Sequence, residues 1–340
     1  MAAANEEAML DRRQMMIASG AALALPGAAC AQEGWRPRAS LPWTVQEIYA
    51  AVHRGRIVTA GGLARGAQGL RIEDRTGLYD PAADAWNEGP RLPEARHHPM
   101  IVEAAGRLFA FGGYRRGQGD WTATNTAWEL TDAGWTPAPA MPGPLCETVG
   151  VGLNGRVHLA TGRSPIGAAN AQWQDQGDVD VHWVFDPAAG RWETARPNPM
   201  ARNSAAGAVL DGAFWVAGGR TVNGGGTGRL DRYDPGGDRW DTLAPIPRSP
   251  GGQQVGGGLA MAARGGKLVA FGGEWFSGQG GGVFPETWIY DPARDVWERG
   301  PDMRTPRHGL AAGEVGGVIY AIAGGEVVSG GRAGGVVEAL

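Results

Sequence analysis

Polar and ionisable side chains recur in this sequence at a set distance from pairs of glycine. In four successive segments a polar residue stands fourteen positions before the first place of the pair. These residues are Glu47, His98, Glu147 and Ser204; a fifth segment with extra residues is expected to bring Gln253 or Gln254 near this place, and a sixth segment His308. Carboxylates and imidazoles are common general acids and bases, so the pattern predicts a site for proton transfer.

A second set of charged and aromatic residues directly follows the glycine pairs. It consists of Tyr114-Arg115-Arg116, Arg163, Arg220, Glu274-Trp275-Phe276 and Glu326. An arginine side chain matches a carboxylate or phosphate with two parallel hydrogen bonds, and aromatic rings can stack on a sugar. The two sets together therefore predict a pocket for a small sugar-like or anionic molecule.

The candidate residues can be assigned to two roles. Candidates for catalysis are Glu47, Glu147, Glu274, His98 and His308. Candidates for ligand binding are Arg163, Arg220, Tyr114, Asn203, Gln254, Trp275 and Glu326. In a sugar acid, Arg163 or Arg220 would hold the carboxylate and Glu147 would move a proton. We assign no metal ligand and no cofactor; the structural alternative is that these side chains only bond neighbouring loop carbonyls.

The glycine pairs mark a repeat that must position these residues. Pairs, one of them degenerate, end apolar runs about fifty residues apart, at Gly61-Gly62, Gly112-Gly113, Thr161-Gly162, Gly218-Gly219, Gly272-Gly273 and Gly324-Gly325. The apolar runs, such as residues 107–111, are rich in strand-forming residues. Four repeats continue with an aromatic-Asp-Pro turn and then a tryptophan, as in Tyr79-Asp80-Pro81 and Trp86.

This order of motifs resembles the kelch repeat, whose unit is one four-stranded blade of a β-propeller. The resemblance implies an all-β fold with six blades, in which both sets of candidate residues surround one mouth of the central channel. The expected repeats lie near residues 41–91, 92–140, 141–197, 198–245, 246–301 and 302–340, the last completed by 34–39. The final repeat lacks a fourth strand with its tryptophan, and residues 34–39, with Trp35, supply one. We therefore expect the N-terminal strand to close the last blade.

The first residues are expected to direct export. Arg12-Arg13 precedes a short apolar stretch and an Ala29-Cys30-Ala31 sequence, the pattern of a cleavable signal in residues 1–31, with the paired arginines of twin-arginine transport. The general secretory route and a lipid-modified Cys30 are the alternatives. Cleavage leaves the propeller at 32–340, in the periplasm or secreted, with Cys146 alone and no intramolecular disulfide.

Charge and composition restrict the partners. The net charge is -4 and basic residues form no long run, which argues against nucleic-acid binding. The apolar stretch of the signal is too short to span a membrane, so no transmembrane segment is expected. We expect a monomer that binds a sugar or sugar acid, or else an acidic protein partner.

Three functions suit an exported propeller of this kind, because the fold does not select one. The leading interpretation is a ligand-binding propeller with mutarotase or epimerase activity, from a loose similarity to periplasmic sialic-acid mutarotases around residues 249–252 and Gly273-Glu274. The alternative is a protein-interaction module of the cell envelope. Copper radical oxidases need a Tyr-Cys cross-link; Cys146 and the mouth histidines suggest one, but the expected Tyr-His pair and extra domains are missing from this sequence.

Overall fold

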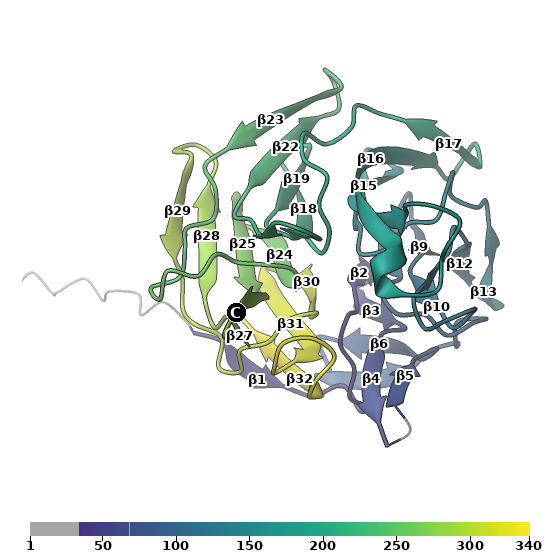
Figure 1. Cartoon of the computed structure of the whole chain (residues 1–340), viewed down its shortest axis with the longest axis horizontal. Helices are drawn as coiled ribbons and strands as arrows, with labels where there is room; N and C mark the ends of the chain where they lie inside the picture. The colour runs from purple at the N-terminus through teal and green to yellow at the C-terminus, as the bar shows by residue number, and fades with distance from the viewer. Residues whose placement is uncertain (1–33, 68) are drawn as a thin grey trace, which may run out of the picture. The chain divides into compact units, whose positions relative to one another are not determined.

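The computed structural model of this 340-residue chain describes residues 34–67 and 69–340, which form six four-stranded antiparallel sheets and four two-stranded hairpins. Figure 1 shows the sheets arranged as blades around a common centre. The fold is therefore the expected six-bladed β-propeller. The expected export signal, with Arg12, Arg13 and Cys30, lies outside the described residues.

Each blade runs from its inner first strand to its outer fourth strand. Blade 1 contains β2 (Ala50–His53), β3 (Arg56–Ala60), β6 (Thr76–Asp80) and β7 (Ala85–Glu88); blade 2 contains β8 (Met100–Ala104), β9 (Arg107–Phe111), β12 (Ala127–Thr131) and β13 (Gly134–Ala138). Blade 3 contains β14 (Val149–Leu153), β15 (Arg156–Pro165), β16 (Gln176–Asp186) and β17 (Arg191–Thr194); blade 4 contains β18 (Ala206–Leu210), β19 (Ala213–Ala217), β22 (Leu230–Asp234) and β23 (Arg239–Leu243). Blade 5 contains β24 (Leu259–Arg264), β25 (Lys267–Gly272), β28 (Thr287–Asp291) and β29 (Val296–Arg299). Blade 6 contains β30 (Ala311–Val315), β31 (Val318–Gly325), β32 (Ala333–Ala339) and β1 (Arg36–Arg38).

Packing between blades provides the hydrophobic core. Each first strand contacts the first strand of the next blade, and β30 contacts β2 to complete the ring. A separate cluster of buried apolar residues fills each of the six interfaces between neighbouring blades. A four-stranded sheet has two faces to bury, and the ring buries both against its neighbours.

The N-terminal strand closes the ring, as the sequence predicts. β1 pairs antiparallel with β32, with Arg36 opposite Ala339 and Arg38 opposite Val337. In Figure 1 this appears as the purple start of the described chain beside the yellow end. Trp35 packs edge-on against Phe271 of blade 5, with ring centroids 4.8 Å apart, and its indole N–H donates to Thr287 at 2.9 Å. Pro37 is tolerated because β1 is the outer edge strand, where a missing N–H breaks no ladder.

The paired glycines end the second strands in left-handed backbone. Gly61 and Gly62 have φ of 70° and 103°, and a side chain on Gly62 would come within 2.3 Å of Ile48. In blade 6 the left-handed pair is Ala323-Gly324, one residue earlier than the glycine doublet, at an irregularity in the pairing of β31 with β32. The spacing of fourteen therefore leads to Gly258 in blade 5 and Gly309 in blade 6, which corrects the expected Gln253 or Gln254 and His308.

Short hairpins and loops stand above the ends of the second strands. The hairpins are β4 (Leu63–Gly66) with β5 (Gly69–Ile72), β10 (Tyr114–Arg115) with β11 (Thr122–Ala123), β20 (Arg220–Thr221) with β21 (Gly225–Gly226), and β26 (Glu274–Ser277) with β27 (Gly280–Val283). In blade 3 the strands themselves extend into a loop that contains the 3-10 helix η1 (Trp173–Asp175). Residues 34–67 and 69–340 contain no helix long and apolar enough to cross a bilayer.

Candidate functional site

Six left-handed residues, one just before the first strand of each blade, form a belt around the axis. The members of this axial belt, with φ between 48° and 71°, are Glu47, His98, Glu147, Ser204, Gly258 and Gly309. Five backbone N–H to carbonyl hydrogen bonds of 2.7–3.1 Å join neighbouring members. Left-handed backbone is unfavourable for residues other than glycine, and such strain is concentrated at functional sites. The belt therefore holds two glutamates and a histidine in fixed positions on the axis.

Glu147 is buried and fully engaged. One carboxylate oxygen accepts from Tyr114 at 3.0 Å and pairs with Arg163 at 3.3 Å, and the other accepts from Ser204 at 2.7 Å and lies 3.5 Å from Arg220. Burial raises the pKa of Glu147, but the charges of His98, Arg220 and Arg163 outweigh it and hold the pKa far below its usual range. With its side chain only 1% exposed, Glu147 is a permanent counter-ion that holds the two arginines.

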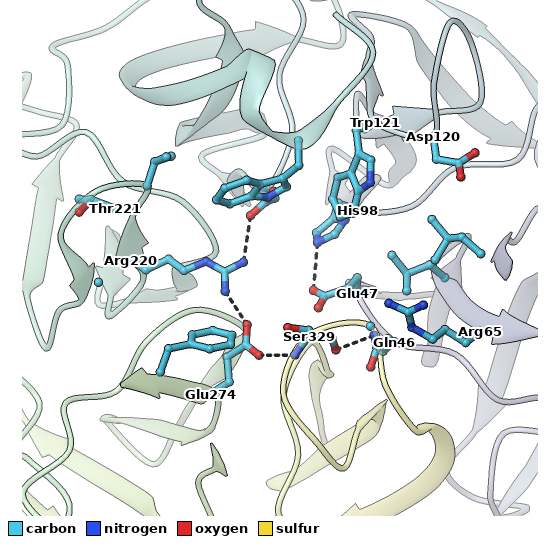
Figure 2. A pocket seen from close by; sticks show the side chains of 18 of the residues that line it. Gln46, Glu47, Arg65, His98, Asp120, Trp121, Arg220, Thr221, Glu274 and Ser329 are labelled. Atoms are coloured by element: carbon cyan, nitrogen blue, oxygen red, sulfur yellow. Dashed lines mark hydrogen bonds and ion pairs between the residues drawn. The ribbon is translucent and has the colours of Figure 1, made fainter. Parts of the chain in front are cut away.

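Arg220 joins this counter-ion to a second buried carboxylate. Its guanidinium contacts Glu274 at 2.5 Å and its Nε–H donates to Asn203 at 3.1 Å, as Figure 2 shows for the bond to Glu274. The other oxygen of Glu274 accepts from the backbone N–H of Ser329 at 2.9 Å. The guanidinium of Arg220 therefore contacts three protein partners, Glu147, Glu274 and Asn203.

His308 lies between two carboxylates. Its Nε2–H donates to the carbonyls of Val327 and Ser329, each at 3.0 Å. Its Nδ1 is buried without a hydrogen bond, 3.4 Å from a carboxylate oxygen of Glu47 and 3.4 Å from one of Glu274. His308 Nδ1 therefore stands between the two acids.

Hydrogen bonds connect His97 to His98, and they fix which ring nitrogens of these two histidines carry protons. His97 Nε2 lies 2.9 Å from the carbonyl of Asp120 and must donate to it, because a carbonyl only accepts. Burial and the neighbouring His98 lower the pKa of His97 to about 3, so His97 is neutral and its Nδ1 accepts from His98 Nδ1–H at 2.9 Å.

The remaining nitrogen of His98, Nε2, lies 3.0 Å from Glu47. If His98 were neutral and Glu47 ionised, the lone pair of Nε2 would face a carboxylate oxygen and the two atoms would repel each other. A proton must therefore lie between them. Burial raises the pKa of Glu47, but the charge and hydrogen bond of His98, together with the charges of His308 and Arg220, outweigh burial and lower the pKa to about 2. His98 and Glu47 are thus joined by one shared proton.

A cavity of about 650 Å³ opens above the axial belt (Figure 2). Glu47, His98, Glu147, Arg220 and Glu274 form part of its lining. Of the three glutamates, Glu47 is the most accessible, with 14% of its side chain exposed against 3% for Glu274. Trp121, Trp173 and Phe276 contribute aromatic wall. On the far side of the belt the axial channel is narrow and lined mainly by apolar residues such as Met100, Val149 and Met261.

Some of the predicted residues line this cavity, and the others lie elsewhere. Five of the twelve candidates line it, namely Glu47, His98, Glu147, Arg220 and Glu274. His308, Tyr114 and Asn203 are buried behind these residues and bond to them or to their neighbours. Gln254 and Trp275 line a neighbouring cavity, and Glu326 pairs with Arg332 at 3.7 Å.

Arg163 needs a correction. Its side chain is fully buried, and its donors go to Glu147 and to the carbonyls of Trp173 and Gln176 at 2.7 and 2.6 Å. The guanidinium also lies 3.8 Å from the ring centre of Trp173. Arg163 therefore supports the wall of the cavity and has no surface to offer a ligand.

Several lining residues were missed by the sequence analysis, above all Arg65. This exposed residue lines the cavity, and its guanidinium has no ion-pair or hydrogen-bond partner in the described part of the chain. Gln46, Asp120, Trp121 and Ser329 were also absent from the candidates. Gln46 stands one residue before Glu47, and the others stand four to nine residues beyond the first position of a glycine pair, where only loop geometry could have revealed them. Within the described ranges, no group of three or more His, Cys, Asp or Glu side chains is arranged to hold a metal ion.

Known proteins share the repeat and the fold. A family model for the Kelch motif matches residues 256–304. Kelch-like protein 34 of Homo sapiens is 34% identical over 170 residues, 50% of this chain and 25% of that protein. Kelch-like protein terF of Aspergillus terreus is 25% identical over 259 residues, 74% of this chain and 54% of that protein. The chain thus spans between a quarter and about half of these curated relatives.

A solved structure agrees over a larger share of both chains. The structure of YjhT has a TM-score of 0.71 and 16% sequence identity, and the match covers 88% of this chain and 95% of that chain. At this identity the similarity establishes a common fold.

Proposed function

This chain is a kelch-repeat β-propeller, and we propose that its axial cavity binds a sugar-like ligand and catalyses the exchange of its anomers. The observation that carries the proposal is the 3.0 Å contact between His98 Nε2 and a Glu47 carboxylate oxygen at the floor of a cavity with aromatic walls. We also propose, from the sequence of residues 1–31, that the protein acts after export.

Anomer exchange needs one base and one acid at neighbouring oxygens. Opening of a pyranose ring removes the proton of the anomeric hydroxyl, breaks the bond from the anomeric carbon to the ring oxygen, and protonates that oxygen. Closure on the other face of the carbonyl reverses these transfers, so no proton is consumed. The two oxygens share one carbon, which suits an acid and a base 3.0 Å apart.

Glu47 and His98 can fill these two roles. The Glu47 carboxylate would take the hydroxyl proton while His98 Nε2–H protonates the ring oxygen. Because they share a proton, the two side chains act as one unit. Glu147 is the less suitable base, since four donors already surround its two oxygens.

The walls suit a sugar that carries a negative charge. Trp121 and Phe276 provide apolar faces on which a sugar ring can stack. Arg65 is free to pair with a carboxylate at the rim, whereas the donors of Arg220 are committed to protein groups.

The proposal is tested by NMR exchange spectroscopy on N-acetylneuraminic acid, galacturonic acid and neutral hexoses. We expect accelerated exchange between the anomers of at least one sugar, and a loss of about 100-fold or more in Glu47→Gln, with binding retained. Glu326→Gln, a change of the same kind outside the cavity, is the matched control and should retain full activity. If a sugar binds but its anomer exchange is not accelerated, the protein is a sugar-binding module and not a catalyst. If no sugar binds and no exchange is accelerated, the proposal is refuted.

One observation favours protein binding as the second candidate. The large hydrophobic side chains exposed among the described residues are Ile166, Phe276 and Val327, and all three stand on loops or hairpins that follow second strands. Exposed apolar groups around a mouth can contact a protein partner. In that case no sugar would raise the melting temperature, and Ile166→Ser would weaken capture of the partner.

A further inference from the structure

A second cavity of about 560 Å³ adjoins the axial cavity. It lies between the hairpin β20–β21, residues 248–256 and the hairpin β26–β27. The two cavities share Arg220, Gly225 and Phe276 as lining residues, so they meet along a common wall. The ring of Phe276, 54% exposed, stands at this boundary.

The chemistry of the second cavity differs from that of the first. Its distinctive side chains are the amides of Gln253, Gln254 and Gln279 together with Arg248 and Trp275. The lining includes no carboxylate and no histidine. Planar amides and aromatic rings bind sugar hydroxyls and ring faces, but this set has no group that could act as acid or base. The second cavity is therefore suited to binding alone.

From this juxtaposition we infer that the site takes an oligosaccharide, with one sugar in the axial cavity and the next in the second cavity. The inference rests on the proposed function and extends it to the length of the ligand. Each cavity falls in the range of about 300–1,000 Å³ that holds one small ligand, so the pair exceeds the needs of a monosaccharide.

The position of the acid–base pair fixes the direction of the chain. Only the reducing-end unit has a free anomeric hydroxyl, and only the axial cavity contains His98 and Glu47. The reducing end therefore lies in the axial cavity, and the glycosidically linked unit crosses Phe276 into the second.

The test compares chain lengths by isothermal titration calorimetry. The probes are N-acetylneuraminic acid, galacturonic acid and N-acetylglucosamine, each with its own linked dimer and trimer. For the sugar that binds, we expect the dimer to bind at least tenfold more tightly than the monosaccharide. The double variant Arg248→Ala/Gln279→Ala should remove this gain and leave monosaccharide affinity within twofold of the wild type.

A matched control separates this effect from a general change of the mouth. Ile166→Ala removes an exposed apolar side chain that lines neither cavity, and it should leave both affinities unchanged. A monosaccharide that binds as tightly as its dimer, or a gain that survives in the double variant, overturns the second subsite while the proposed function stands. Failure of every probe at every length overturns both.

Discussion

At the scale of single residues, burial decides what equivalent positions do. Glu47 and Glu147 occupy the same belt position in two blades and both line the cavity, yet 14% of the Glu47 side chain is exposed against 1% of the Glu147 side chain, which four donors enclose. Arg65 and Arg163 show the same contrast between a free and a buried guanidinium. The sequence could predict which positions face the mouth from their spacing. It could not predict which would be covered, because the loops that cover them follow no repeat.

Buried histidines make this molecule sensitive to acid. His158 Nδ1 and His182 Nε2 lie 2.9 Å apart, and burial, with neighbouring charge in the case of His158, lowers their pKa values from 6.5 to about 3 and about 4. Between those values and 6.5 the unfolded chain binds protons that the folded chain does not, so the free energy of unfolding falls as the pH falls. Each histidine contributes a slope of up to about 1.4 kcal/mol per pH unit.

His158→Gln tests this directly, because the amide can still donate to His182 but cannot take up a proton. In urea unfolding at pH 7, 6 and 5, we expect the variant to lose about 1 kcal/mol less per pH unit than the wild type. His53→Gln serves as the control, since His53 is only partly buried and its pKa is lowered by less. Parallel stability curves for the wild type and His158→Gln would contradict the assignment.

At the scale of elements, the outer-strand tryptophans fasten each blade to the one before it. The indole N–H donates to a backbone carbonyl of the preceding linker, as Trp86 does to Ala39 and Trp297 to Ala244, both at 2.8 Å. Where that linker residue has its own N–H, an aspartate accepts it together with a tyrosine hydroxyl: Asp84 with Tyr79, Asp238 with Tyr233 and Asp295 with Tyr290.

Blades 2 and 3 show why this clamp is incomplete in part of the ring. There the tryptophans donate to Pro90 and Pro139, which have no N–H. These blades have Leu130 and Phe185 where blades 1, 4 and 5 have tyrosine, and blade 3 has Gly190 in place of the aspartate. The aromatic-Asp-Pro motif was visible in the sequence, but the linker residue to which its tryptophan donates lies 44 to 53 positions earlier, and only the structure identifies it.

Asp295→Ala should destabilise the protein, because it leaves Tyr290 Oη and the Ala244 N–H without an acceptor. We expect a loss of about 2 kcal/mol in the free energy of unfolding, and about 1 kcal/mol for Tyr290→Phe alone. In a double-mutant cycle Tyr290→Phe should cost much less once Asp295 is absent. Additive losses would show that the two groups act independently. Gly190→Asp in blade 3 is the converse control and should gain nothing, since Pro139 and Phe185 offer no donor.

At the scale of the whole molecule, closure depends on a strand from the other end of the chain. The missing fourth strand in the last repeat predicted that residues 34–39 would complete it, and β1 does so. The predicted belt residues were wrong in blades 5 and 6, although the spacing of fourteen itself holds in blade 5 and leads to Gly258. In both blades the belt residue is a glycine, so it carries no polar side chain that the sequence could reveal. In blade 6, moreover, Ala323 adopts the left-handed conformation that the first glycine of the pair has in other blades. A side chain on Gly309 would come within 2.7 Å of Glu47, so this glycine makes room for the acid.

Trp35 should therefore be the residue on which closure depends most. It is buried between blades 5 and 6, and Trp35→Ala should cost about 3–5 kcal/mol as a large-to-small change in a core. Trp35→Phe keeps an aromatic ring but loses the hydrogen bond to Thr287, so the loss in free energy of unfolding should be nearer 1 kcal/mol.

A chain that begins at residue 40 should be destabilised more than either substitution, because it also exposes the edge of β32. We expect concentration-dependent aggregation by light scattering as well as a lower melting temperature. If all three changes melted like the wild type, the pairing of β1 with β32 would not hold the ring closed. A loss in the order truncation, alanine, phenylalanine would show that packing of Trp35 and pairing of the edge both stabilise the ring.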